Sequence, residues 1–76
     1  MKEVLKLIIE NLVEDKNSIQ ISEQIENKTA TYKVKVNQSE MGKIIGKQGK
    51  TAKSIRTIMK ALAIKEQKKV SVEFID

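Results

Sequence analysis

The stretch Met41-Gly42-Lys43-Ile44-Ile45-Gly46-Lys47-Gln48-Gly49-Lys50-Thr51-Ala52-Lys53 decides the fold of this chain. Two of its three glycines, Gly46 and Gly49, are separated by two residues and stand between segments with helical spacing, so we expect a tight loop that joins two helices. Gly46 is expected to take a positive φ where the first helix ends, and Gly49 to remove a side chain where the second begins. Backbone N–H groups at a helix start, next to lysines, attract anions. The loop therefore points to a ligand.

The residues before the loop predict one helix and two strands. Residues 2–13 carry apolar side chains at helical spacing, which indicates an amphipathic first helix. Apolar and polar residues then alternate in residues 19–25 and again in residues 30–36, as in two strands with one buried face. Asn27-Lys28 separates these runs, so we expect a hairpin, whose turn type stays open because the dipeptide lacks glycine.

The helices around the loop and a last strand complete the predicted fold. Asn37 is expected to cap the short helix before the loop, with Glu40 completing a capping box. A longer helix is expected to begin near Lys50, and residues 70–74 alternate as a third strand. The order α-β-β-α-α-β predicts an α+β fold, with a three-stranded sheet covered on one face by three helices, as one domain over residues 1–76.

Composition narrows the classes of function. The 76 residues include neither cysteine nor histidine, so the commonest general base, the cysteine nucleophiles and most zinc sites are missing. An enzyme is disfavoured, and no metal or organic cofactor is expected. No apolar stretch approaches the roughly 20 residues that span a bilayer, and the start, Met1-Lys2-Glu3-Val4, lacks a cleavage pattern. We expect a cytoplasmic, unprocessed protein without membrane contact.

Charge is unevenly distributed along the chain. The net charge is +5, from 15 basic and 10 acidic residues, and residues 33–76 hold most of the basic ones. Residues 42–60 contain no acid and six bases, namely Lys43, Lys47, Lys50, Lys53, Arg56 and Lys60. On the helix after the loop, Lys53, Arg56 and Lys60 form a basic ridge beside an expected core stripe of Ala52, Ile55, Met59, Leu62 and Ala63. Such a local field attracts a polyanion.

The loop and the element order also match a known family. Ile44-Ile45-Gly46-Lys47-Gln48-Gly49 resembles the signature loop of a KH domain, and the predicted order resembles the type II arrangement. The longer run through Thr57, together with the chain length, resembles the small stand-alone bacterial KH proteins of the KhpA family over essentially the entire chain. The resemblance implies binding of single-stranded RNA by a chaperone or post-transcriptional regulator linked to cell-wall growth and cell shape. It further implies a homodimer and pairing with a larger KH-containing partner of the KhpB/Jag type.

The resemblance also assigns candidate RNA-binding residues. In this family the loop clamps the backbone of about four nucleotides, whose bases lie in a groove with an apolar floor. Gly46 and Gly49 would then supply backbone clearance, Lys47 and Gln48 would face the phosphates, and Ile45 would form the groove floor. The remaining candidates are Gly42 and the peripheral basic residues Lys43, Lys50, Lys53 and Arg56.

Two features suggest that bases are read weakly. Ala52 stands three positions beyond the loop, where the family usually has a large aliphatic residue, and this is expected to widen the groove. Tyr32 and Phe74 are the only aromatic residues, so the stacking platform of other single-strand binders is missing. Phosphate contacts are therefore expected to dominate binding.

Two other nucleic-acid interpretations were weighed. Gly49-Lys50-Thr51 ends like the nucleotide-binding loop G-x-x-x-x-G-K-[ST], but its first glycine would fall at Ile44, so nucleotide hydrolysis is disfavoured. A helix-turn-helix reader of duplex DNA stays open as an alternative. The basic ridge is mostly lysine, however, which suits phosphates better than base edges.

The remaining alternative is a dimerisation module with weak or no RNA binding. Ser54, Ile58 and Ala61 lie at the margin of the core stripe, away from the basic ridge. Ile58 either completes the core or contributes to an interface. The residues alone favour the core, whereas the family resemblance favours an interface.

Overall fold

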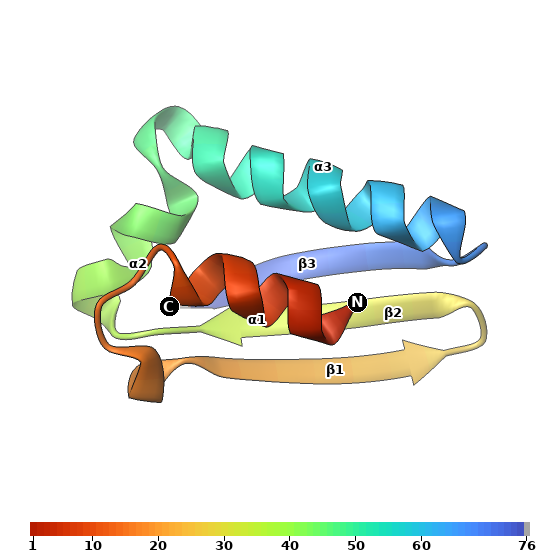
Figure 1. Ribbon diagram of the computed structural model, residues 1–76, viewed down its shortest axis with the longest axis horizontal. Coiled ribbons are helices and arrows are strands. Elements are labelled where there is room, and N and C mark those ends of the chain that lie inside the picture. The colour runs from red at the N-terminus through yellow and green to blue at the C-terminus, as the bar shows by residue number, and fades with distance from the viewer. Residues whose placement is uncertain (76) are drawn as a thin grey trace.

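Residues 1–75, which the computed structural model describes, form a three-stranded sheet with three helices on one face (Figure 1). The helices are α1 (Lys2–Glu10), α2 (Gln38–Ile45) and α3 (Lys50–Lys65). The strands are β1 (Gln20–Glu26), β2 (Thr29–Lys35) and β3 (Lys69–Ile75), and the short 3-10 turns are η1 (Lys16–Ser18) and η2 (Lys47–Gly49). The predicted α-β-β-α-α-β order and α+β class are confirmed, and the arrangement is that of a type II KH fold.

The central strand is β2, which pairs antiparallel with β1 and parallel with β3. Glu26 lies opposite Thr29, so the predicted hairpin is confirmed, with a two-residue turn in which Asn27 has a φ of 57°. Tyr32 lies opposite Val72 in the parallel pair. The parallel crossover from β2 to β3 contains α2, the loop and α3. The sheet therefore holds the start of α2 through β2 and the end of α3 through β3.

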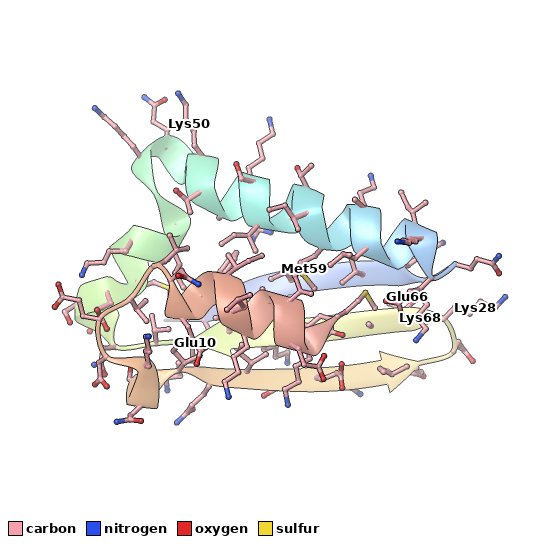
Figure 2. All side chains as sticks on the ribbon, viewed as in Figure 1. Glu10, Lys28, Lys50, Met59, Glu66 and Lys68 are labelled. Carbon is pink, nitrogen blue, oxygen red and sulfur yellow. The ribbon has the colours of Figure 1, made fainter. Side chains whose placement is uncertain are left out.

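The core lies between the sheet and the helices. On β2, Ala30, Tyr32 and Val34 are fully buried, and the residues between them are more exposed, as the alternation predicts. The predicted stripe on α3 is also buried, except that Leu62 is only half-buried, and Figure 2 shows Met59 beneath α3. No helix within the described residues is long and apolar enough to cross a membrane.

Two elements before the loop differ from the prediction. The first helix ends at Glu10 rather than at residue 13. At this end the Asn11 side-chain amide donates a 2.7 Å hydrogen bond to the Leu7 carbonyl. Val13 nevertheless stays buried, packing into the core from the connection that follows. The predicted buried face of β1 is also incomplete, because this strand lies at the sheet edge and leaves 53% of Ile25 exposed.

The capping box predicted at the start of α2 is wrong. Neither Asn37 nor any other side chain in residues 1–75 caps that helix. The Glu40 carboxylate instead accepts hydrogen bonds from the backbone N–H groups of Glu14 at 2.6 Å and Asp15 at 3.2 Å. These bonds, with the Glu14 bond contributing most, lower the pKa of Glu40 although burial acts in the opposite direction. Glu40 therefore attaches α2 to the connection after α1.

Candidate nucleic-acid interface

Three of the four residues in the loop after α2 have a positive φ. Gly46 has a φ of 77°, and its N–H donates a 2.8 Å hydrogen bond to the Gly42 carbonyl as α2 ends. Gln48 and Gly49 follow with φ values of 58° and 75°. The Gly49 N–H closes the turn on the Gly46 carbonyl at 3.2 Å. The positive φ predicted for Gly46 is confirmed.

The glycines of the loop are needed for different reasons. A Cβ on Gly46 would lie 2.7 Å from the Thr51 Cβ and 2.8 Å from the Thr51 backbone nitrogen, so both space and conformation require glycine there. A Cβ on Gly49 would meet nothing within 4 Å. Within the fold it is therefore the positive φ of Gly49 that favours glycine, and the backbone clearance that Gly49 is expected to give a ligand stays a prediction.

The N-terminus of α3 lies open beside the loop. Its N-cap is Gly49, no side chain in residues 1–75 caps the helix, and its first turn has no acidic residue. The Lys50 N–H donates to the Lys47 carbonyl within the preceding turn, so it is the positive end of the helix dipole that faces the loop. Lys47 and Gln48 are exposed at the loop tip, and Figure 2 shows Lys50 extending outward at the start of α3.

The lysines of the interface are not equivalent. Within residues 1–75, Lys47, Lys50 and Lys53 are exposed and make no ion pair. The Lys43 ammonium, by contrast, lies 3.5 Å from the Glu40 carboxylate and 3.8 Å from that of Glu14. The stretch that is free of acids in the sequence is therefore not free of them in space, because the fold brings both carboxylates to Lys43.

Arg56 is held against the last strand instead of extending freely from the basic ridge. Its Nε–H donates a 3.1 Å hydrogen bond to the Val72 carbonyl, and its guanidinium carbon lies 5.1 Å from the centre of the Phe74 ring. A hollow of about 220 Å³ beside it is lined by Arg56, Lys60, Val70, Ser71 and Val72. Sequence reasoning predicted the strand that contains Phe74 but not its contact with Arg56, because no local pattern signals a pair 18 positions apart.

The other candidates occupy two different places. Ile45 is half-buried at the end of α2 and packs against the core, next to the loop, while Gly42 is exposed within α2. On α3, Ser54, Ile58 and Ala61 are exposed, and Ile58 keeps 45% of its surface accessible. The interpretation of Ile58 as a core residue is therefore wrong, and its role in an interface stays a prediction.

Comparison with known proteins identifies the family. The family model described as "KhpA/KhpB, KH domain" matches residues 2–74. The RNA-binding protein KhpA of Clostridium perfringens is 45% identical over 75 residues, which cover 99% of this chain and 100% of that protein. The proteins of the same name from Listeria monocytogenes serovar 1/2a and Chlamydia trachomatis serovar D are 37% and 38% identical over 76 residues. These matches cover 100% of this chain, and 100% and 97% of the two relatives. The chain therefore belongs to the KhpA/KhpB family of KH-domain proteins.

Proposed function

We propose that the protein binds single-stranded RNA by clamping its phosphate backbone on the loop from Gly46 to Gly49. The observation that carries this proposal is the glycine loop with exposed Lys47 and Gln48 at its tip, directly before a helix N-terminus that no side chain in residues 1–75 caps. The positive end of the α3 dipole supplies positive potential there, as do the ammonium groups of Lys47 and Lys50, which make no ion pair within residues 1–75, and this potential suits phosphate. Relatives named RNA-binding proteins support the choice of RNA over other polyanions.

A clamp that contacts phosphates should bind RNA strands of many different sequences. Phosphates carry no sequence information, so most of the affinity is shared by all RNA strands. Broad binding suits an RNA chaperone or post-transcriptional regulator acting on many transcripts in the cytoplasm. The link to cell-wall growth and cell shape enters this proposal from the family resemblance alone, and its test is the phenotype of cells that carry a loop variant.

The clamp is tested with the double variant Lys47→Asp/Gln48→Asp. Two carboxylates at the loop tip would repel phosphates, so binding of a fluorescent single-stranded RNA should fall at least about tenfold. The matched control is Lys16→Asp/Asn17→Asp in η1, because it makes the same charge change in another exposed turn, well separated from the loop (Figure 1). Unchanged binding by the loop variant, or an equal loss in the control, would refute the clamp.

A second proposed function is assembly through α3. Ile58 is a large apolar residue left 45% exposed, and the small residues Ser54 and Ala61 lie one turn before and after it. A surface of this shape favours close packing of a second helix. We propose that it forms a homodimer, and that a larger KH-containing partner of the KhpB/Jag type competes for the same surface.

A further inference from the structure

The free edge of β3 and the side of α3 enclose a hollow that contains a fixed guanidinium group. On its other edge β3 pairs with β2, and no further strand in residues 1–75 covers the edge that Arg56 contacts. Val70 contributes apolar surface to the hollow and Lys60 a positive charge, whereas the Val72 side chain is buried in the core. The hollow lies beside α3, the helix that begins at the loop. When the loop clamps an RNA strand, nucleotides next to the clamped ones can therefore reach the hollow.

Arg56 is positioned before any ligand arrives. The hydrogen bond from its Nε to the Val72 carbonyl fixes one edge of the guanidinium, and the Phe74 ring supports one face. The terminal amino groups make no hydrogen bond or ion pair with any of residues 1–75. Their donors are thus free in a fixed orientation, unlike those of the flexible lysines around the loop.

The free donors of Arg56 match one base better than the others. With Nε occupied, the two terminal nitrogens remain as a pair of parallel donors. Guanine offers the adjacent acceptors O6 and N7, which pair with two such donors, whereas adenine pairs N7 with a donor at N6. A phosphate could accept the same donors, but the half-buried apolar side chain of Val70 beside them can pack against a base and offers a phosphate no partner.

We propose that Arg56 selects guanine at the one nucleotide that occupies this hollow. This inference rests on the proposed RNA clamp and makes it specific at a single position, while phosphate contacts carry the rest of the binding. It differs from the role that the family resemblance assigns to Arg56, which is that of a peripheral basic contact.

The test compares tetranucleotides that differ by one base. Uridine tetramers with a single guanine, adenine or cytosine at each position are titrated against the wild type and Arg56→Lys. The wild type should prefer guanine at one position by roughly 5- to 150-fold, the range for a good bidentate pair. Arg56→Lys keeps the charge but not the planar pair of donors that Val72 and Phe74 hold in place, so its affinity for the guanine tetramer should fall to that for the all-uridine tetramer.

Lys53→Gln is the matched control on the same helix. It should weaken all tetramers equally and leave the guanine preference intact, because Lys53 is exposed and does not line the hollow. Thermal unfolding of Arg56→Lys checks that the loss of the Val72 hydrogen bond leaves the fold intact. If this variant unfolds, NMR signals of the Arg56 side chain in the wild type replace it, and they should shift with the guanine tetramer but not with the all-uridine one.

The outcomes separate the two proposals. Equal binding of all tetramers by the wild type would overturn the role of Arg56 while leaving the clamp in place. A uniform loss with Arg56→Lys would show a phosphate contact, and would overturn it too. If the wild type bound none of the tetramers, both the clamp and the guanine preference would be refuted.

Discussion

Gly46 and Thr51 approach so closely that a Cβ on the glycine would lie 2.8 Å from the threonine backbone nitrogen. Gly46 ends α2, and Thr51 stands in the first turn of α3. The contact sets the distance between the two helices and thereby the shape of the loop. Since the obstacle includes backbone and the Cβ of Thr51, a side-chain rotation cannot relieve it.

The three glycines therefore predict a graded series of alanine variants. Gly49→Ala should cost about 1–2 kcal/mol, because its φ of 75° is unfavourable for alanine although its Cβ has open space. Gly46→Ala should cost clearly more, because the overlap with Thr51 adds to the penalty of a backbone conformation, φ 77° and ψ 175°, that is almost exclusive to glycine. Gly42→Ala lies in α2 with open space and should stabilise the protein by about 0.5–1 kcal/mol. Urea unfolding measures all three, and equal losses at positions 46 and 49 would refute the role of Thr51.

Glu40 should make stability depend on pH in the acidic range. Its pKa is lowered from 4.5 in the folded protein, chiefly by the hydrogen bond from the Glu14 N–H. Below the unfolded-state pKa the unfolded chain binds the proton more readily, so this contribution is present at neutral pH and is lost as the pH falls through the folded-state pKa. Glu40→Gln should be less stable at neutral pH and lose less on acidification.

Thermal unfolding from about pH 7 down to about pH 3 measures this effect. Glu10→Gln is the control, because this carboxylate lies at the end of α1 and makes no ion pair within residues 1–75. Parallel stability curves for the wild type and Glu40→Gln would contradict the attachment of α2 through this residue.

The helices and strands were predicted correctly, whereas the capping box of Asn37 and Glu40 was not, and this contrast shows what the sequence can predict. Periodicity predicted the strands and helices because burial against one sheet face repeats regularly along each element. The capping box failed because Glu40 had two possible sets of backbone donors, those of its own helix and those of Glu14 and Asp15. Only the packing of α2 against the connection after α1 decides between them, and that contact spans 26 positions.

In the candidate site, too, local features could be predicted from the sequence and contacts between distant parts of the chain could not. The positive φ of Gly46 follows from local chemistry, as does the cluster of exposed lysines around it. The environments of Lys43 and Arg56 could not be predicted from local chemistry, because Glu14 and Val72, their partners, come from other parts of the chain. Residues that are alike in the sequence therefore differ in how freely they can contact a ligand.

The salt dependence of RNA binding should reveal this difference between lysines. Each phosphate contact with single-stranded RNA contributes about 0.7 to the slope of log K against log salt concentration. Lys50→Gln should reduce the slope by about that amount, because Lys50 has no acidic partner within the described residues. Lys43→Gln should change it less, since Glu40 and Glu14 already neutralise Lys43. Fluorescence anisotropy at several salt concentrations measures both, and equal changes would contradict this ranking.

The proposed interface on α3 predicts that Ile58→Lys yields a folded monomer. Ile58 is 45% exposed, so a lysine there can reach solvent and the melting temperature of the monomer fold should change little. In a dimer the same ammonium would be buried against an apolar surface without a partner, which is costly enough to prevent association. Ile64→Lys is the control, because Ile64 is 65% exposed near the other end of the same helix and lies outside the proposed interface.

Sedimentation equilibrium gives the mass in solution, and circular dichroism confirms the fold. We expect dimers for the wild type and Ile64→Lys, and a monomer for Ile58→Lys. A monomeric wild type, or a dimer that tolerates Ile58→Lys, would refute the interface at Ser54, Ile58 and Ala61. An unfolded Ile58→Lys would contradict the exposure of Ile58, because a side chain that already reaches solvent should accept a charged end without loss of the core.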